Sequence, residues 1–479
     1  MSIVYLGIDI GTTSAKCLAV DETGAVLAQA QQPYVLQHPH QGWAEQSPED
    51  YLQALVTIVR ECVRRCRAQG IAPGDIAAMS MSTQGDTLIV TDGRGRALAK
   101  AISWMDSRAQ EEYQALLAQA DQAFWYRQTG QRLTPYGSAC KIRWLAEQQS
   151  DLWARVSRVC AVPDYLAACL CGRFATDIPS ASWSACFKPH DRAWSVPVME
   201  LLGIVPEQLP QVVESGAAIG PLLPEAATQL GLTPDTMLMA GAFDQGAAAL
   251  GAGARAGGHG VLSCGTAWVL YAVTVHPYSD SQTMLPLCCH TGSSEWGLLA
   301  PFTGGAAYDW FRHVFKEDSD SPTSGRAESL YFLPYLYGVG VPDWRAEVCG
   351  TLLGLTMAHN RADIEQAVMC GIGCETRRCL EIIETLSGPL PGLRMVGGAT
   401  KSTVWPQIIA DLLGRPVQVS VSSEAAAYGA AKLAAGPHSA GWPEMPHTVV
   451  EPVPEGVKDM NVYYARYQRC RAGILPLYS

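Results

Sequence analysis

The chain has 479 residues, more than the roughly 250 to 300 residues at which a single hydrophobic core stops growing, so we expect two domains of similar size with a cleft between them. Its formal net charge is −11, and lysine and arginine are scattered rather than clustered, which argues against nucleic acid or an anionic membrane surface as partner. Apolar residues make up 48% of the chain without any low-complexity run, so we expect a folded protein that binds a small ligand.

The start of the chain and its sixteen cysteines predict a cytoplasmic protein. Asp9 interrupts the first apolar run and no basic segment precedes it, so we expect no secretory leader. The closest cysteine spacings, Cys62 with Cys66 and Cys370 with Cys374, fall in helical patterns and favour buried thiols over zinc ligands. No apolar run reaches the roughly 18 residues of a membrane span.

The first predicted elements are a β-hairpin over residues 4–20, because two apolar runs flank a turn of small polar residues. A clear helix follows, with Ser47 as N-cap, Pro48 at the first helical position and a glycine at the end. Residues 76–83 and 86–92 have the apolar, β-branched composition of strands.

The second half of the chain repeats the β-rich start of the first half after a helical region. Residues 108–230 are mostly helical by period, and a second β-rich part begins near residue 236. Because an apolar strand ends in Gly-Thr in each half, the sequence predicts one duplicated unit per domain. Further along, we expect a long helix, a strand that runs into a glycine turn, and a helix of small residues, at 361–388, 393–400 and 423–436.

The turn after the first strand has the composition of an anion site. Successive backbone N–H groups in a Gly-Thr-Thr turn form a concave nest, and hydroxyl groups add donors. Asp9 would repel a bare phosphate, so its presence makes sense if a divalent cation lies between them. An ordinary hairpin turn explains the same residues equally well, and the chain has no P-loop motif.

Two later turns are ambiguous when read alone. Asp244 in "AGAFDQG" lies between an apolar strand and a helix start, where an aspartate also serves as an N-cap. The "VGGAT" turn at 396–400 permits close backbone approach to a ligand, yet it is also a plain strand-to-helix turn.

The order of these motifs resembles the FGGY carbohydrate kinases, the sugar-kinase branch of the actin, hexokinase and heat-shock chaperone ATPase superfamily. The resemblance runs from Gly7 to about Ala435. Tyr136 to Gln148 fits the first signature of the family. The other pieces include "GIDIGTTSAK", "GWAEQSPEDY", "ISWMDSRA", "PDYL", "TDIPSAS", "GAFDQG", "SCGTA", "FLPYLYG", "GTLLGL", "VGGATKS" and "EAAAYGAA".

The resemblance implies an α/β fold of two domains, 1–243 and 244–479, each with an actin- or ribonuclease H-like mixed sheet flanked by helices, and an active site in the cleft between them. It implies that Asp9 holds Mg²⁺ through water and that Asp244 is the catalytic base. It implies that ATP is bound by the first phosphate loop with Lys16 nearby, by the second phosphate loop, and by a ribose and adenine site. These three groups are Gly11, Thr12, Thr13, Ser14 and Lys16; Gly265 and Thr266; and Gly305, Asp309, Gly398, Ala399 and Ser402.

The acceptor site is expected in the first domain, at Gln84, Gly85 and Asp86. Glycerol kinases carry Gln-Arg-Glu in this triplet and xylulokinases carry Gln-Met-His, so the chain matches neither. We expect Gly85 to leave room for a longer substrate and Asp86 to accept hydrogen bonds from two hydroxyl groups. Trp104, Asp106, Arg108, Tyr136 and Gln245 match further acceptor-site positions. Alternatively, Trp104 and Tyr136 are core aromatics, and Asp106 with Arg108 is an ion pair that holds a loop.

The implied reaction is phosphorylation of a small sugar hydroxyl by MgATP, with D-xylulose as the first choice of acceptor and D-xylulose 5-phosphate as product. Ribulose or other pentuloses, glycerol, erythritol and sugar acids stay open, because pocket specificity depends on loop geometry. A chaperone-like or filament-forming ATPase and a catalytically weak sugar sensor are the alternatives from other classes. The first would need a long segment after Ala435, and the second would be expected to lack Asp244. A homodimer is possible.

Overall fold

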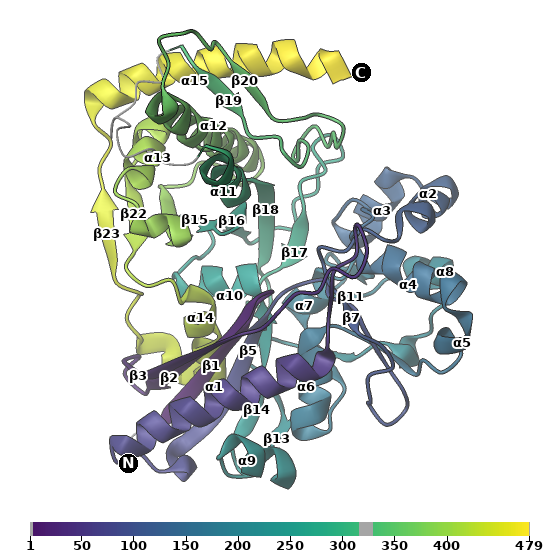
Figure 1. Cartoon of the computed structure of the whole chain (residues 1–479). Coiled ribbons are helices and arrows are strands. Elements are labelled where there is room, and N and C mark those ends of the chain that lie inside the picture. The colour runs from purple at the N-terminus through teal and green to yellow at the C-terminus, as the bar shows by residue number, and fades with distance from the viewer. Residues whose placement is uncertain (1–2, 316–328, 479) are drawn as a thin grey trace.

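The computed structural model describes residues 3–315 and 329–478. It contains two large mixed sheets, each flanked by helices, and a mostly helical part inserted into the first half (Figure 1). The predicted two-domain α/β architecture is therefore confirmed. The proposed division at residues 243 and 244 leaves each sheet whole, with the first sheet ending at Phe243, and stays a prediction.

The first sheet has its predicted hairpin near the centre. Its strands lie in the order β13 (Ala218–Pro221), β14 (Met237–Phe243), β5 (Ile76–Thr83), β1 (Val4–Ile10), β2 (Ser14–Asp21) and β3 (Val26–Pro33). The hairpin strands are antiparallel, whereas β1, β5 and β14 run parallel to one another. Parallel neighbours place the loops that follow them at the same edge of the sheet.

The second sheet repeats this plan. Its order is β23 (His447–Val450), β22 (Val417–Ser420), β21 (Leu393–Gly397), β15 (Gly260–Cys264), β16 (Ala267–Thr274), β18 (Trp296–Thr303) and β17 (Leu287–Cys289). The pair β15 and β16 is antiparallel like β1 and β2, and β15, β21 and β22 are parallel like β1, β5 and β14. The predicted duplication is thus visible in the topology, with the one extra strand β17 at the edge.

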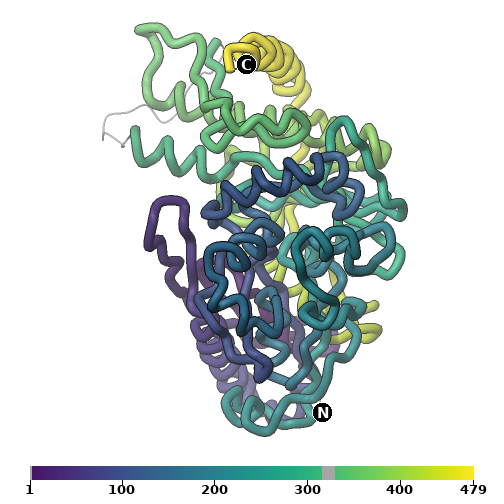
Figure 2. Tube along the Cα trace, turned by 90° about the vertical axis from the view of Figure 1, so that its right-hand side faces the viewer, coloured from purple at the N-terminus to yellow at the C-terminus, as the bar shows by residue number. Residues whose placement is uncertain are grey.

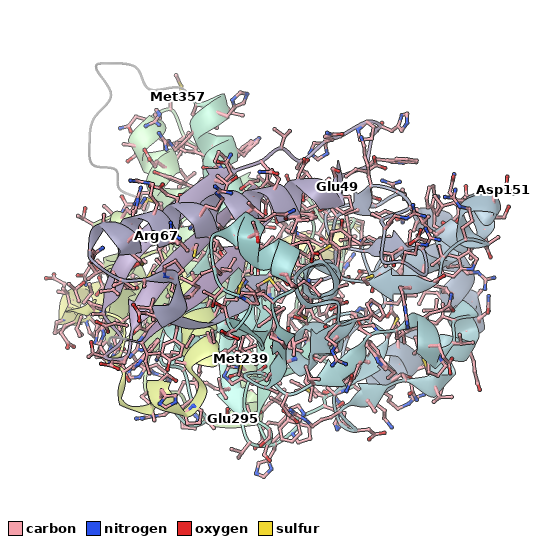
Figure 3. All side chains as sticks on the ribbon, turned by 90° about the horizontal axis from the view of Figure 1, so that it is seen from below. Glu49, Arg67, Asp151, Met239, Glu295 and Met357 are labelled. Atoms are coloured by element: carbon pink, nitrogen blue, oxygen red, sulfur yellow. The ribbon has the colours of Figure 1, made fainter. Side chains whose placement is uncertain are left out.

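Helix α1 (Pro48–Ala68) covers strands β2 and β3 of the first sheet. It begins after Ser47 as predicted, although the Ser47 hydroxyl donates to Glu49 rather than capping the backbone. Figure 3 shows the helix from below, with Glu49 near one end and Arg67 near the other. Its apolar face includes Tyr51, whose side chain reaches the site described below.

The inserted part, shown in blue and teal in Figure 2, packs around its own apolar core and carries several short strands. The helices around this core are α2 (Gln110–Gln119), α3 (Gln122–Thr129), α4 (Ser138–Gln148), α5 (Ser150–Trp153) and α8 (Val196–Leu202). Helices α6 (Val162–Cys171) and α9 (Pro224–Leu230) instead pack with α1 in the core of the first sheet, and α7 (Ile178–Ser182) contacts β14. The short strands in the first half are β4 (Glu45–Gln46), β6 (Ile89–Thr91), β7 (Ala101–Ile102), β8 (Arg158–Cys160), β9 (Ala175–Asp177), β10 (Phe187–Lys188), β11 (Ala193–Trp194) and β12 (Gln211–Val213).

The second sheet is flanked by α11 (Gly305–Val314), α12 (Arg361–Ser387), α13 (Trp405–Leu413) and α15 (Pro454–Ile474), with the small pair β19 (Tyr331–Leu333) and β20 (Thr351–Leu353) beside them. The long helix expected at 361–388 is therefore present. Its apolar residues enter the largest core cluster together with Tyr463 and Tyr467 of α15.

Two helices of small residues join the halves. Helices α10 (Asp244–Gly251) and α14 (Ala425–Ala435) pack on each other, and α14 also lies against β1 and β5 (Figure 1). The backbones approach so closely that a Cβ on Gly251 would overlap the carbonyl oxygen of Ala425, and one on Gly429 would overlap that of Ala247. This contact lets the two halves pack closely without long side chains between these helices.

All sixteen cysteines have free thiols, and thirteen of them are buried, as the sequence predicted. Within residues 3–315 and 329–478, no helix has the length and hydropathy that crossing a bilayer requires. In the same residues, no three His, Cys, Asp or Glu side chains gather in a way that would hold a metal ion by themselves.

Candidate active site

Three predicted site segments lie at one edge of the first sheet. The Gly11 turn follows β1, Gln84 follows β5, and Asp244 follows β14. The register pairs Ile10 with Thr83 and Thr83 with Phe243, so the three chain segments leave the sheet side by side. The carboxyl ends of parallel strands are where α/β proteins bind ligands, because the loops there open toward solvent while the strands stay buried.

The turn after β1 is held open by bonds to its carbonyl groups. Gly11 donates its N–H to the Ser14 carbonyl at 3.0 Å, and the Tyr34 hydroxyl donates to the Gly11 carbonyl. The Thr12 carbonyl accepts from Gln46 Nε2 at 2.7 Å, and the Thr13 carbonyl accepts from the Tyr34 N–H at 3.0 Å. The N–H groups of Thr12 and Thr13 donate to no backbone carbonyl in the described part of the chain, an arrangement that suits an anion.

Asp9 and Asp244 form an acidic pair below this turn. Burial raises the pKa of Asp9 to about 6, against the hydrogen bond of 2.9 Å that it accepts from Ser82 Oγ and the charge of Lys16. Burial raises the pKa of Asp244 to about 7, and the charge of Asp9 adds to that rise. Because burial raises the pKa of both carboxyl groups, and the charge of Asp9 acts on Asp244, the site favours a protonated Asp244 or a bound cation.

This donor set fits Mg²⁺. The ion keeps several water ligands and is held in phosphate-transfer sites by one or two carboxylates together with the substrate phosphates. Asp9 at the end of β1 supplies such a carboxylate, and the Gly11 turn beside it supplies N–H donors rather than further ligands.

Lys16 lies beside Asp9 across the hairpin, where the register pairs the two residues. Its ammonium group forms an ion pair of 3.1 Å with Glu424, the residue before α14. It therefore ties the first sheet to the second half of the molecule, and its charge acts on Asp9 as described above. A phosphate near this ammonium would compete with Glu424 for it.

Gln84 is linked to the phosphate turn through a buried relay. Its Nε2 donates to the Tyr51 hydroxyl at 3.1 Å, this hydroxyl donates to Gln46 Oε1, and Gln46 donates to the Thr12 carbonyl. The Oε1 atom of Gln84 is buried without a hydrogen-bond partner among the described residues. An orphaned buried acceptor of this kind suits a ligand hydroxyl.

The side chain of Asp86 caps the start of helix α4. Asp86 adopts a left-handed backbone conformation, with φ of 56°, which is uncommon for a residue other than glycine and is often found at functional sites. Its Oδ1 accepts from the Ser138 N–H at 3.0 Å, while Lys141 Nζ donates to the Asp86 carbonyl at 3.1 Å. Because Oδ1 caps the helix in this way, Asp86 has less free capacity than the two-hydroxyl prediction assumed.

The space beside Gly85 is filled, which corrects the expectation that this glycine leaves room for a longer substrate. A Cβ at residue 85 would overlap Cδ1 of Trp183 and lie 3.0 Å from its Nε1. The indole therefore takes the volume that a side chain at residue 85 would occupy. Sequence reasoning missed this residue, because Trp183 is remote in the chain and follows no recognisable pattern.

Trp104 and Tyr136 are surface aromatics rather than core residues. Their exposed fractions are 37% and 48%. The Trp104 indole donates from Nε1 to Thr12 Oγ1 at 2.9 Å, so the predicted acceptor side and the phosphate turn are in direct contact. The exposure of both rings argues against the core-aromatic alternative.

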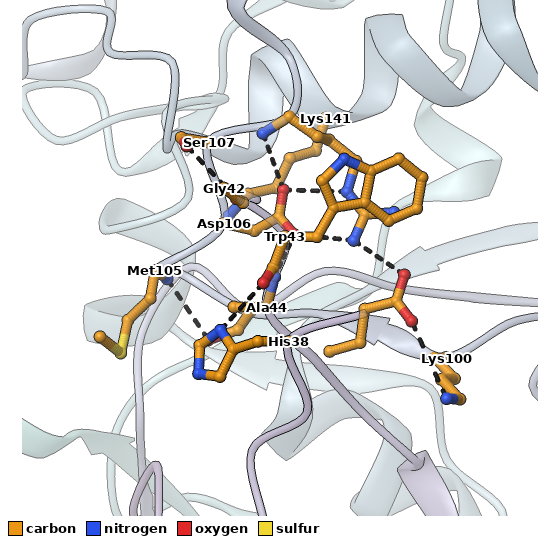
Figure 4. A network of polar contacts seen from close by, with 12 residues as sticks. His38, Gly42, Trp43, Ala44, Lys100, Met105, Asp106, Ser107 and Lys141 are labelled. Carbon is orange, nitrogen blue, oxygen red and sulfur yellow. Dashed lines mark hydrogen bonds and ion pairs between the residues drawn. The ribbon is translucent and has the colours of Figure 1, made fainter. Parts of the chain in front are cut away.

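Asp106 and Arg108 form a buried ion pair. Figure 4 shows Asp106 within a network of polar contacts that includes Trp43 and Ala44. Asp106 is fully buried, and its oxygens accept from the Ala44 N–H at 2.6 Å and from Arg108 Nε at 2.9 Å and Nη2 at 2.7 Å. The Arg108 guanidinium also bonds Glu45 and lies 3.6 Å from the centre of the Trp43 ring. Because its oxygens are occupied in this way, Asp106 fixes the conformation of its loop. This favours the ion-pair alternative over direct contact with a substrate.

The second phosphate turn lies at the corresponding edge of the second sheet. Gly265 and Thr266 follow β15 and are exposed. The start of α11 closes on them: the Thr266 carbonyl accepts from the Ala306 N–H at 2.9 Å, and a Cβ on Gly305 would overlap the Gly265 carbonyl oxygen. Gly305 is thus required by a close backbone contact that shapes this turn.

The other predicted nucleotide residues lie next to this turn or on α11. Cys264 pairs with Gly397 in the register of β15 and β21, so Gly398 and Ala399 follow the neighbouring strand. Ser402 accepts at Oγ from the N–H groups of Val404 and Trp405, at 3.2 and 3.3 Å, just before and at the start of α13. Asp309 is exposed on α11. Ser402 therefore has a structural bond in addition to its predicted role.

The family comparison agrees with this arrangement. Residues 4–251 match the N-terminal domain of the FGGY family of carbohydrate kinases, and residues 307–436 match its C-terminal domain. The chain belongs to this family. It is a carbohydrate kinase, and the family implies ATP as co-substrate.

Among curated relatives of this kinase, the xylulose kinase of Escherichia coli (strain K12) is 27% identical over 90% of the chain and 89% of its own length. The gluconokinase of Bacillus subtilis (strain 168) is 26% identical over 90% and 87%, and the glycerol kinase of Rhodopseudomonas palustris is 30% identical over 90% and 89%. A crystal structure of a xylulose kinase from Brucella ovis superposes with a TM-score of 0.91 at 27% identity, covering 99% of this chain and all of that one. The family is thus shared by relatives with different acceptors in their names.

Proposed function

We propose that this kinase transfers the γ-phosphoryl group of ATP to a hydroxyl group of a small sugar, with D-xylulose as the preferred acceptor and D-xylulose 5-phosphate as product. The proposal rests on one observation: the anion-binding turn, the Gln84–Asp86 segment and Asp244 leave three adjacent parallel strands at the same edge. The names of the xylulose kinase relatives support the choice of acceptor, and the likeness to a gluconokinase and a glycerol kinase keeps those acceptors as alternatives.

In the proposed mechanism, Asp244 accepts the proton of the sugar hydroxyl as its oxygen attacks the γ-phosphorus and the bond to the departing ADP breaks. An aspartate normally titrates near pH 4, too low for an efficient base at neutral pH. Burial and Asp9 raise the pKa of Asp244 to about 7, which brings it into the useful range. Its Oδ1 accepts from the Gln245 N–H at 2.7 Å, which orients the carboxylate.

The remaining residues position the reactants. The turn from Gly11 to Ser14 would bind the phosphates from one half, and the Gly265–Thr266 turn would bind them from the other. Asp9 would hold Mg²⁺, which supplies neutralisation of the charge on the phosphoryl group in transfer. Holding the two substrates in line and excluding water provides most of the rate in this class of reaction.

The test is ADP release with MgATP against D-xylulose, D-ribulose, L-ribulose, L-xylulose, glycerol, erythritol and gluconate. Wild type is compared with Asp244→Asn and with Asp235→Asn, a matched change of an exposed aspartate just before the same strand, at its other end. We expect turnover of D-xylulose, a fall of about 10² to 10⁴ in kcat for Asp244→Asn, and no change for Asp235→Asn. Equal activity in Asp244→Asn would refute the catalytic role, and preference for another compound would replace D-xylulose as acceptor.

A further inference from the structure

Trp183 is held in a fixed position beside the proposed acceptor site. It follows α7, whose first turn is capped by Asp177. Its neighbour Ser182 donates to the Pro179 carbonyl and accepts from the Cys289 N–H, both at 2.9 Å. On the other side, the Ser184 hydroxyl donates to the Ala181 carbonyl at 2.7 Å, and the Ser184 carbonyl accepts from Ser138. The backbone on both sides is thus fixed.

The indole contacts the residues that precede the two key carboxylates. Its face stacks on Phe243, with ring centroids 5.2 Å apart and planes 10° from parallel, and Asp244 is the next residue. Its Cδ1–Nε1 edge lies against the backbone of Gly85, and Asp86 follows. The ring therefore packs against one residue of the proposed acceptor triplet and against the residue directly before the proposed base.

Part of the ring remains available to a ligand. Trp183 is only partly buried, whereas Phe243 beneath it is almost completely buried. Its Nε1–H donates no hydrogen bond to any residue in the described part of the chain. A rigid aromatic face with an unused N–H donor suits the C–H groups and one hydroxyl of a sugar.

The surrounding charge is negative. Asp9, Asp86 and Asp244 contribute three carboxyl groups. Lys141, whose charge acts on Asp86, is fully buried and already donates to the Asp86 carbonyl. Lys16, whose charge acts on Asp9, is paired with Glu424. A sugar acid brought to this site would therefore place its carboxylate among these groups while the two lysines that act on them, among the described residues, already have partners.

We infer that Trp183 replaces the missing side chain of residue 85 as a neutral wall of the acceptor pocket, and that this pair makes the site specific for uncharged polyhydroxylated acceptors over sugar acids. This inference rests on the proposed function, because it assumes that Asp86 and Asp244 bind and activate the acceptor. Trp183 is a specificity-determining residue that would touch the substrate. Gly85 contributes indirectly, because its lack of a side chain leaves space for the Trp183 indole.

The test is a double-mutant cycle with Gly85→Ala, Trp183→Ala and the double variant, with Trp153→Ala as a matched control at a partly buried tryptophan of α5. For the best neutral acceptor, we expect Trp183→Ala to raise KM about tenfold, with kcat and the KM for ATP within about threefold of wild type. Gly85→Ala is expected to raise the same KM about tenfold by displacing the indole, and the double variant to be no worse than Trp183→Ala. Wild type is expected to prefer the neutral acceptor over gluconate by at least about 10² in kcat/KM, and this ratio falls in Trp183→Ala.

A second readout is acceptor binding by titration calorimetry in the Asp244→Asn background, in which binding is separated from turnover. The Kd is expected to rise about tenfold with Trp183→Ala. An unchanged KM and Kd in Trp183→Ala, additive effects of the two substitutions, or a preference for gluconate would each overturn the inference while the kinase assignment stands. No turnover of any acceptor by wild type would overturn the proposed function, and the inference with it.

Discussion

The two phosphate turns occupy matching places in duplicated sheets, yet they are built differently. The first turn lies in a dense network, in which Tyr34, Gln46 and Trp104 donate to its carbonyl and hydroxyl oxygens. The second turn is exposed and is shaped by the start of α11, through the Ala306 N–H and the close approach of Gly305. The same topology therefore supports a turn fixed by side chains in one half and a turn fixed by backbone contact in the other.

The charge of the two turns differs as well. Asp9 lies two residues before Gly11, whereas the corresponding place before Gly265 is Ser263. The turn with Asp9 lies beside the proposed base and acceptor residues. The turn with Ser263 lies beside the residues predicted to bind the ribose and adenine of the nucleotide. The difference teaches that duplication supplied two turns at matching places and that only one of them has, two residues before its glycine, a carboxylate of the kind that the proposed cation requires.

Among substitutions that test the difference between the two turns, Gly305→Ala is expected to have the largest effect on kcat/KM for ATP. The added methyl group would overlap the Gly265 carbonyl oxygen, so the second turn must move. A displacement of about 1 Å in a phosphate-binding group costs on the order of 10² in kcat/KM for ATP, and we expect the KM for the acceptor to stay within about twofold. Steady-state kinetics with each substrate varied would measure this.

The control for that substitution is Gly473→Ala in α15, where an added Cβ meets no atom within 4 Å. It is expected to behave as wild type. If Gly305→Ala kept its full kcat/KM for ATP, the second turn would not depend on backbone contact with α11.

A smaller effect is expected from Trp104→Phe, which removes the hydrogen bond to Thr12 Oγ1. The loss of one such bond, worth about 1 kcal/mol, corresponds to a fall of about fivefold in kcat/KM. Thr12→Val is expected to give a similar loss, and the double variant to lose no more than either alone. Additive losses would contradict the idea that this bond couples the acceptor side to the first turn.

The matched control is Trp310→Phe, at an exposed tryptophan of α11 with 39% exposure. Its indole donates no hydrogen bond to the described residues, so its kinetics are expected to be unchanged.

The smallest effect is expected on the stability of Asp244→Asn, and it tests the negative charge on the side of the first turn. Because the pKa of Asp244 is raised to about 7 in the folded protein, the folded state retains a proton between pH 4 and 7 that the unfolded chain has released. The ligand-free protein therefore loses stability as the pH rises through this window. Asp244→Asn stays neutral, so its melting temperature at pH 8 is expected to exceed that of wild type by about 2 °C and to converge with it near pH 4.

Thermal unfolding at a series of pH values would measure that difference, with Asp235→Asn as the exposed control that follows wild type. A lower melting temperature for Asp244→Asn at pH 8 would show that the carboxylate is favourable in the free protein. The sign of the melting-temperature difference between Asp244→Asn and wild type therefore tells whether residue 244 is adapted to bind a ligand or to stabilise the free protein.

Local patterns determined much of this molecule. The hairpin over residues 4–20, the helix after Ser47 and the two Gly-Thr turns were predictable because period, capping and turn chemistry act over a few neighbouring residues. The order of the motifs identified the family, and with it the candidate base, the phosphate turns and the two-domain fold.

Only the tertiary structure decided which side chains have free atoms and which spaces are filled. It placed Trp183 against Gly85, occupied the oxygens of Asp106, turned one oxygen of Asp86 to the cap of α4, and raised the pKa of Asp244 beside Asp9. Each of these depends on contacts between residues far apart in the chain. Burial and electrostatic interaction depend on distance in space, so a pattern of neighbouring residues carries no record of them.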